Sequence, residues 1–250
     1  MRPLIGEVLR KLRGARKRIR KYRLSSRWKK SVSSGSLAPN EDSSGRRIYS
    51  LVLNLDARQD RLAKFETEIQ KLQFSDWERV GAVDGSEKFP DLPRFFAGSL
   101  GCTLSHIDAL QLTRAKSRGP VMICEDDIEF VGPPEEIRAC IDEFLTTPQL
   151  DILALSGRAR GGSHPISPKL RVVVGLVGRG CYLVKPHMIE PLIAAFDAGV
   201  PKLLASNRKG KGDLMWSTLQ KNHFFAMPRG NLARQSEGFS DIEGRELGPR

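Results

Sequence analysis

Apolar and polar residues recur with two different periods along residues 47–228. Short runs rich in β-branched and other apolar residues predict strands within 47–55, 77–85, 120–127, 150–157, 170–186 and 223–228. Between these runs, apolar residues three or four positions apart predict helices at 58–72, 99–117, 134–147, 187–199 and 211–221. Because strands alternate with helices and the strands are largely apolar, we expect an α/β fold with a mixed, mostly parallel sheet flanked by helices.

Residues 1–30 have a different pattern, in which a single apolar stripe runs along a basic helix. Its members lie three or four positions apart: Ile5, Val8, Leu12, Ala15, Ile19 and Tyr22. The segment holds 13 Lys or Arg residues and one acid, so it accounts for the whole formal net charge of +12. A basic amphipathic helix is typical of attachment to an anionic membrane surface, and Trp28 favours the same interpretation. A calmodulin-type target, an organelle presequence and a solvated tail stay open as alternatives.

The composition divides the chain into four segments. We expect a basic helical extension at 1–30, a flexible Ser- and Gly-rich linker at 31–46, a catalytic domain at 47–243 and a tail at 244–250. No apolar run reaches the length of a membrane span, and the first 30 residues lack the apolar stretch of a secretory signal. The four cysteines show no zinc-type spacing with histidines, which indicates a reducing compartment.

Three adjacent acids end the buried strand predicted at 120–127. Glu125, Asp126 and Asp127 repel one another unless a positive group compensates them. Carboxylate oxygens suit Mg²⁺ or Mn²⁺, and in extended chain Glu125 and Asp127 share one face while Asp126 points away. We therefore predict a divalent metal held by Asp127 and Glu125, which would offset charge on a diphosphate. A solvated acidic loop without a ligand is the alternative.

Polar residues also follow the first two predicted strands, and ligands of open α/β sheets bind beyond such carboxyl ends. After the first strand, Asn54 and Asp56 are candidates for contact with a nucleotide, and Arg58 and Arg61 for contact with its phosphates. The alternative is that Asp56 caps the next helix and both arginines lie on the surface. After the second strand, Asp84 is a further candidate for contact with a donor.

Other motifs point to no chemistry of their own. Ser105 and His106 have no acid partner in sequence that would complete a hydrolytic triad, and a single helical histidine is more often structural. The glycines at 175, 178 and 180 do not form a dinucleotide-binding fingerprint.

An ordered set of motifs resembles glycosyltransferase family 25, which includes lipopolysaccharide-core and collagen galactosyltransferases. The matching stretches are VLNLDARQDRL at 52–62, VGAVDG at 80–85, SLGCTLSHIDAL at 99–110, VMICEDDIEF at 121–130 and GRGCYLVKPHMIEPLI at 178–193. Fainter matches occur at 211–219 and 233–242, so the resemblance covers residues 47–242. It implies a GT-A-type fold that binds a UDP-sugar, commonly UDP-galactose, and transfers the hexose with inversion to a hydroxyl of an acceptor glycan.

The resemblance also implies roles for particular residues. The acidic triplet is then the family's metal site, with Asp126 and Glu125 also contacting the donor. Inversion needs a general base, and our candidate is Asp213 in the stretch KGDLMW. Asp84 is the rival candidate. The structural alternative is that Asp213 only caps the helix that follows it. Gln235 and the pair Ser240–Asp241 are expected to close the donor pocket.

The implied partners are a UDP-sugar and a lipid-linked or lipopolysaccharide glycan. Such acceptors lie at the cytoplasmic leaflet, so we expect a cytoplasmic protein held at the inner face of the membrane by residues 1–30. Two other classes compete with this hypothesis. A catalytically silent relative would bind a glycan or a partner, although the intact acidic triplet argues against it. A nucleic-acid-binding protein would use residues 1–30, which the neutral body disfavours.

Overall fold

The computed structural model describes residues 2–34, 47–116 and 119–248. Twelve strands are assigned within these residues: β1 Ile48–Asn54, β2 Ser75–Gly81, β3 Val121–Glu125, β4 Ile128–Phe130, β5 Ile152–Ala154, β6 Arg158–Pro165, β7 Leu170–Val177, β8 Cys181–Val184, β9 Phe225–Pro228, β10 Ala233–Gln235, β11 Gly238–Ser240 and β12 Arg245–Leu247. The α-helices are α1 Arg2–Ser34, α2 Gln59–Gln70, α3 Gly85–Lys88, α4 Arg94–Lys116, α5 Pro134–Thr146, α6 Ile189–Asp197, α7 Val200–Leu204 and α8 Gly212–Met215. Short 3₁₀ segments are η1 Pro186–Met188, η2 Arg208–Gly210 and η3 Trp216–Lys221.

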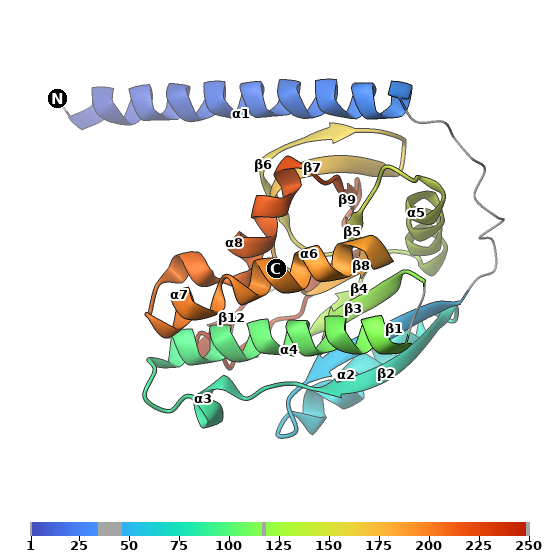
Figure 1. Ribbon diagram of the computed structural model, residues 1–250, viewed down its shortest axis with the longest axis vertical. Helices are drawn as coiled ribbons and strands as arrows, with labels where there is room; N and C mark the ends of the chain where they lie inside the picture. The colour runs from blue at the N-terminus through green and yellow to red at the C-terminus, as the bar shows by residue number, and fades with distance from the viewer. Residues whose placement is uncertain (1, 35–46, 117–118, 249–250) are drawn as a thin grey trace.

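The central sheet has eight strands in the order β2-β1-β3-β8-β5-β9-β7-β6 (Figure 1). The pairs β1–β2, β1–β3 and β5–β9 are parallel, whereas β8 and β7 run against their neighbours. Six strands therefore share one direction, and the predicted mixed, mostly parallel α/β sheet is confirmed.

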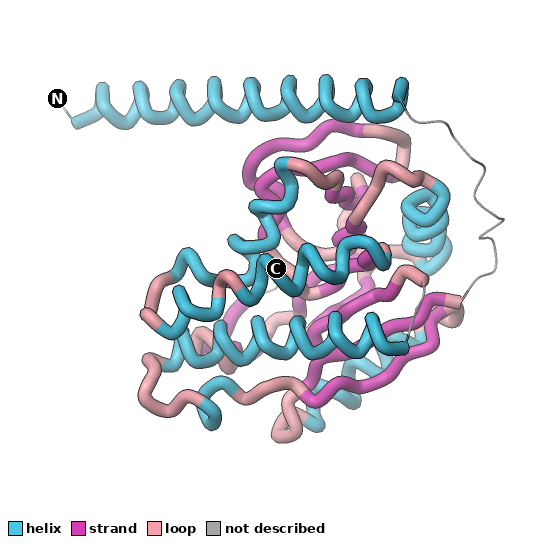
Figure 2. The backbone as a smooth tube through the Cα atoms, in the orientation of Figure 1, coloured by secondary structure: helices cyan, strands magenta, loops and turns pink. Residues whose placement is uncertain are grey.

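Helices cover both faces of this sheet, and each face has its own apolar core. On one face, α2 and α5 contribute Phe65, Ile69, Ile141 and Phe144. On the other face, α4 and α6 lie side by side (Figure 2) and pack residues such as Leu110 and Phe196 against the strands. The middle strand β3 is buried on both sides, from Val121 to Cys124, which explains its continuous apolar run.

Close packing brings the loop after β2 against α4. A Cβ atom on Gly85 would lie 1.8 Å from the Ala97 carbonyl oxygen, and one on Gly101 would lie 2.5 Å from that of Val83. Only glycine fits at these two positions, so the VDG turn and the first half of α4 form one wall near the carboxyl ends of the strands.

The C-terminal part of α1 packs into the domain, which differs from the predicted separate extension. Leu24 is buried, and Trp28, only 9% exposed, meets the ring of Phe224 edge-on with 5.1 Å between ring centroids. Arg27 donates hydrogen bonds to the carbonyls of Gln220, Lys221 and His223, where the η3 segment ends. The interpretation of Trp28 as a membrane-interface residue was therefore wrong, because its indole belongs to the core.

Ile19 and Tyr22 of the predicted apolar stripe face away from this contact. Ile19 is 52% exposed and Tyr22 75% exposed, whereas Leu24 lies about 140° around the helix from Ile19. Helix α1 runs along the β6 edge of the sheet (Figure 1) and extends to Ser34, so residues 31–34 of the predicted linker are helical. Residues 35–46 lie outside the described part of the chain. No described helix combines the length and hydropathy that crossing a membrane requires.

Strand β6 was not predicted from sequence. Its residues are Arg- and Gly-rich, and it pairs with β7 through an irregular register between Ala159 and Gly162. It lies at the sheet edge beneath α1, so its strand character depends on its neighbours rather than on its own side chains.

The docking of α1 predicts a large stability cost for Trp28→Ala. Loss of this buried ring should lower the free energy of unfolding by about 3 kcal/mol, measured by chemical denaturation. Tyr22→Ala, on the exposed face of the same helix, is the matched control and should change it by less than about 0.5 kcal/mol. Equal stabilities of the two variants would contradict the docked position of α1.

Candidate functional site

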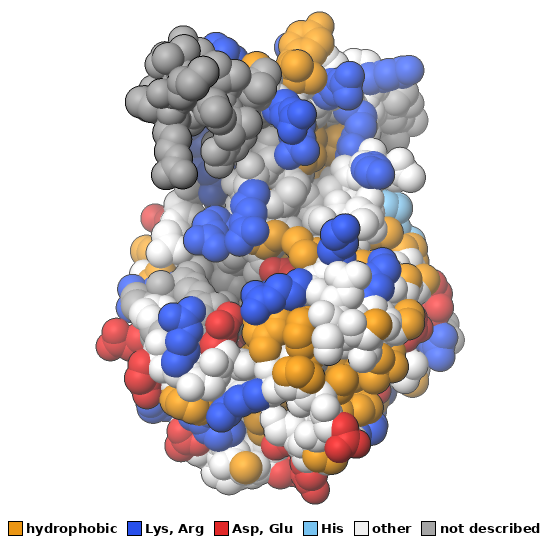
Figure 3. All heavy atoms as spheres, turned by 90° about the vertical axis from the view of Figure 1, so that its left-hand side faces the viewer, with side chains coloured by type: hydrophobic (Ala, Val, Ile, Leu, Met, Phe, Trp, Pro, Cys, Tyr) orange, Lys and Arg blue, Asp and Glu red, His pale blue; other side chains and the backbone are white. Residues whose placement is uncertain are grey.

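A cleft of about 1620 Å³ opens beyond the carboxyl ends of β1 and β3. Its walls come from the loops after β1, β2 and β3, the first half of α4, the β7–β8 turn, and the segment around Asp213. Residues 235–246, here called the C-terminal segment, complete the wall and contact the first turns of α4. Figure 3 shows this side of the molecule, with Lys and Arg side chains gathered around its hollowed middle.

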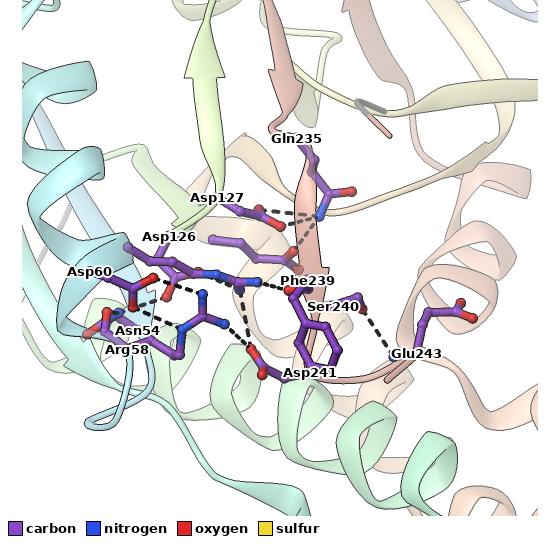
Figure 4. A network of polar contacts seen from close by, with 12 residues as sticks. Asn54, Arg58, Asp60, Asp126, Asp127, Gln235, Phe239, Ser240, Asp241 and Glu243 are labelled. Atoms are coloured by element: carbon purple, nitrogen blue, oxygen red, sulfur yellow. Dashed lines mark hydrogen bonds and ion pairs between the residues drawn. The ribbon is translucent and has the colours of Figure 1, made fainter. Parts of the chain in front are cut away.

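Glu125 and Asp127 turn toward the same side chain, as the period of two predicts for extended chain. The amide Nε2 of Gln235 donates to Glu125 Oε2 at 2.9 Å and lies 3.3 Å from Asp127 Oδ2 (Figure 4). Gln235 reaches this place because β10 pairs antiparallel with β4, which sets Gln235 opposite Ile128. Glu125 and Asp127 therefore form one polar cluster with Gln235 of the C-terminal segment.

Asp126 points away from that cluster into a separate network (Figure 4). Its carboxylate accepts a 2.7 Å hydrogen bond from Asn54 Nδ2 and lies 3.4 Å from Arg61 Nη1. Burial raises the pKa of Asp126, and the bonds from Asn54 and Arg61 partly offset this effect. Asn54 is itself buried and accepts from Arg79 Nε, so its side chain supports Asp126 and does not line the cleft.

Asp127 carries negative charge that no described cation neutralises in an ion pair. Burial, with the charges of Glu125 and Asp126, raises its pKa to about 7. A carboxyl with such a pKa, open to a cleft, fits a site for a positive ligand.

A second cluster adjoins Glu125 from helix α4. His106 Nε2 lies 3.2 Å from Glu125 Oε1, and its Nδ1 lies 3.1 Å from the Tyr182 hydroxyl. Cys102 Sγ, His106 Nε2 and a Glu125 oxygen all lie within 4.8 Å of one another, so these three side chains could hold a metal ion.

The protonation states of this second cluster follow from burial. Burial, together with the charge of Arg179, lowers the pKa of His106 to about 4, so its ring is neutral near pH 7. Burial also raises the pKa of the Cys102 thiol to about 12. Burial acts to raise the pKa of Glu125, but the bond from His106 and the charge of Arg179 bring it below its usual value. Glu125 is therefore ionised, and its Oε1 atom accepts a hydrogen bond from the N–H of His106 Nε2.

The other predicted residues fall into two groups. Arg58, Arg61, Asp84 and Asp213 line the cleft, whereas Asp56 is exposed outside it and pairs with Arg79. Asp56 does not cap α2, whose N-cap residue is Arg58.

The two arginines are already paired with acids. Arg58 pairs with Asp60 and with Asp241 at 2.6 Å, and Arg61 lies within ion-pair distance of Asp126 and Asp241. Asp241 therefore connects the C-terminal segment to the loop after β1 (Figure 4).

The two candidates for a general base differ in their surroundings. The carboxylate of Asp84 accepts hydrogen bonds from the backbone of Ser86 and Glu87, so it caps α3. Asp213 does not cap α8, whose N-cap is Lys211, and its buried Oδ1 atom has no hydrogen-bond partner.

Sequence reasoning missed Cys102, His106 and Arg179 as residues of this site. The first two are four positions apart on α4, so the stretch CTLSH places both on one helical face. That spacing was the available signal, but only the fold brings these two side chains to Glu125. For Arg179, in the β7–β8 turn, no local signal existed.

Comparison with known proteins gives limited information. No family model and no curated protein matches the chain. A solved glycosyltransferase involved in the glycosylation of the major capsid of PBCV-1 is similar in structure, with a TM-score of 0.42 and 12% sequence identity over 70% of this chain and 76% of that one. The resemblance to family 25 is not confirmed by these comparisons and stays a prediction.

The pKa of Asp127 predicts how stability changes with pH in metal-free protein. The folded-state pKa of Asp127 is about 7, above its unfolded value of about 4. Protonated Asp127 therefore contributes its full stability below about pH 4, and this contribution is lost as the pH rises through about 7. Asp127→Asn should therefore have a higher melting temperature than wild type at pH 8 in EDTA, with the difference vanishing near pH 4.

Asp91→Asn provides the control, because Asp91 is exposed on the surface and outside the cleft. The difference in melting temperature between Asp91→Asn and wild type should stay the same from pH 4 to pH 8. An Asp127→Asn protein that melts below wild type at pH 8 would contradict the raised pKa.

Proposed function

We propose that the protein is a GT-A-type glycosyltransferase that transfers a hexose, most consistently galactose, from a UDP-sugar to a hydroxyl of a glycan acceptor with inversion. The observation that carries the proposal is the pair Glu125 and Asp127, which ends a buried strand and faces a large cleft together with Gln235. A cleft of this size accommodates a nucleotide sugar together with part of an acceptor.

The carboxylates of Asp127 and Glu125 would hold a divalent cation, Mn²⁺ or Mg²⁺. The fit rests on the chemistry of these oxygen donors and on the pKa of Asp127, which burial and the neighbouring carboxylates Glu125 and Asp126 raise to about 7. Gln235 Nε2 now lies between the two carboxylates, and rotation of its amide would present the carbonyl oxygen in the same place. When bound, the cation would offset charge on the diphosphate leaving group.

Cys102 and His106 are less suited as ligands of that cation. The thiol is protonated because burial raises its pKa to about 12, and a guanidinium N–H of Arg179 donates to the sulfur at 3.2 Å. We assign His106 a positioning role: its N–H holds Glu125 ionised and oriented, and the Tyr182 hydroxyl holds the ring.

The donor would bind between the loop after β1 and the C-terminal segment. Arg58, Arg61 and Asp84 line this part of the cleft, and Asn54 keeps Asp126 in place beneath it. Asp56 would contact a donor only if its pair with Arg79 opened. Ser240 and Asp241 lie on the outer wall, where they would cover the nucleotide.

Asp213 would act as the general base that takes the proton of the acceptor hydroxyl. Its free Oδ1 atom is the acceptor that such a hydroxyl needs, and it lines the same cleft as the acidic pair. Asp84 is less suited, since its carboxylate already accepts two backbone hydrogen bonds.

Donor binding that depends on the metal is the first test. In thermal-shift titrations, a UDP-hexose with Mn²⁺ should raise the melting temperature of wild type, and neither alone should do so fully. UDP-galactose, UDP-glucose and UDP-N-acetylglucosamine identify the sugar. Asp127→Asn should lose the metal-dependent part of the shift because it loses one ionised ligand.

Asp213→Asn is the matched variant for the chemical step. It should bind the donor as wild type does and lose transfer activity by about a hundredfold or more. If no UDP-sugar stabilises wild type with or without metal, the protein is better described as a silent binding module.

We also propose that α1 holds the enzyme at an anionic membrane surface on the cytoplasmic side, near a lipid-linked or lipopolysaccharide acceptor. Two observations support this partner. Ile19 and Tyr22 are exposed on the face of α1 turned away from the domain, and basic residues flank them: Arg16, Arg18, Arg20, Lys21 and Arg23. Exposed apolar residues within a basic helix suit insertion at the headgroup level.

Ile19→Asp combined with Tyr22→Asp should weaken co-sedimentation with vesicles containing anionic lipid, because two acids replace the apolar contacts. Both side chains are exposed, so the melting temperature should stay within about 2 °C of wild type. Deleting the helix is the poorer test, since Trp28 belongs to the core. Undiminished vesicle binding by the double variant would remove α1 as the membrane contact.

A further inference from the structure

Arg179 lies deep in the cleft, on the turn between β7 and β8, and is only 7% exposed. Three neighbours hold its guanidinium. One N–H, of Nη2, donates to Cys102 Sγ at 3.2 Å, and the Cζ atom lies 4.8 Å from the centroid of the Phe196 ring. The backbone of Gly212 lies so close that a Cβ atom there would be 2.3 Å from Nη1. The guanidinium is therefore fixed in direction before any ligand arrives.

This cation forms no ion pair within the described residues, although its charge helps lower the pKa of Glu125. Its buried Nη1 atom has no hydrogen-bond partner. Arg58 and Arg61, which sequence reasoning assigned to phosphates, are both paired with acids instead. Arg179 is thus the arginine of the inner cleft that is free to take an external anion.

A second hydrogen-bond donor without a partner lines the same cleft. Ser99 Oγ is buried and unpaired, and Ser99 lies three positions before Cys102 on α4, on the same helical face. Both Ser99 and Arg179 line the cleft. Buried polar atoms without partners are rare because they lose their hydration without compensation, so two donors of this kind in one cleft indicate a missing ligand.

The chemistry of these donors selects an anion. A planar guanidinium binds the oxygens of phosphate or carboxylate through parallel, charge-assisted hydrogen bonds. A neutral sugar hydroxyl would satisfy Nη1 but leave the buried charge uncompensated.

We propose that Arg179, together with Ser99, forms an anion-binding subsite that holds a phosphate of the donor. The inference rests on the proposed function and assigns its diphosphate to particular side chains. Arg179 contacts Cys102, whose thiol donates to Glu125, and it packs on Gly212, which precedes Asp213. Arg179 therefore adjoins both the carboxylates proposed for the metal and the segment that carries the proposed base.

Arg179→Met tests the subsite, because methionine keeps the apolar stem and removes the charge. Binding of UDP, UDP-galactose and UDP-glucuronic acid is measured by calorimetry in Mn²⁺. We expect the affinity for UDP and both UDP-sugars to fall by about tenfold or more. Arg158→Met removes an exposed arginine from the mouth of the same cleft and should change these affinities by less than about twofold.

The melting temperature without ligand separates this role from a structural one. Burial of the guanidinium opposes folding, whereas its charge near Glu125 favours it, so Arg179→Met should melt within about 3 °C of wild type. A variant that melts well below wild type, or does not fold, would show that the guanidinium holds the structure together and would overturn the proposal.

Two binding results also overturn it. If UDP binds the variant as tightly as wild type, no phosphate contacts Arg179. If only UDP-glucuronic acid loses affinity, the subsite takes a carboxylate of the sugar instead. Both results presuppose that wild type binds UDP; if wild type binds none of the three compounds, the proposed function itself fails.

Discussion

The structure of the site depends on one constraint, which is that three acids end a strand buried on both faces. Glu125, Asp126 and Asp127 cannot lie together in a partly desolvated place unless other groups offset their charge. The fold directs the three side chains to different surroundings. Asp126 turns to Asn54 and Arg61, whereas Glu125 and Asp127 turn into the cleft. Only the second pair keeps an excess of negative charge, and that pair faces the space where a ligand would bind.

The groups that surround the acids come from distant parts of the chain. His106 arrives on α4 and Gln235 on β10. The cleft is therefore closed by pairings such as β4 with β10, and by the contact of Asp241 with Arg58 across 183 residues. Residues 235–246 line the cleft, and none of them belongs to the eight-stranded sheet.

Two faces of α1 have different surroundings. Leu24 and Trp28 complete the core, and Arg27 satisfies carbonyl groups at the end of η3, so the helix cannot leave without a cost in stability. Ile19 and Tyr22 face solvent. Any contact made by the second face would therefore be transmitted rigidly to the folded domain, rather than through a flexible tether.

Local sequence determined most strands of the sheet and the helices that cover it, since their periods of two and 3.6 depend on neighbouring residues alone. The same period of two placed Glu125 and Asp127 on one side and Asp126 on the other. The tertiary structure alone decided that α1 is docked, that β6 is a strand, that Asn54 supports Asp126, and that Arg179 and His106 belong to the site. Each of these depends on contacts between residues far apart in the chain, and no local periodicity carries that information.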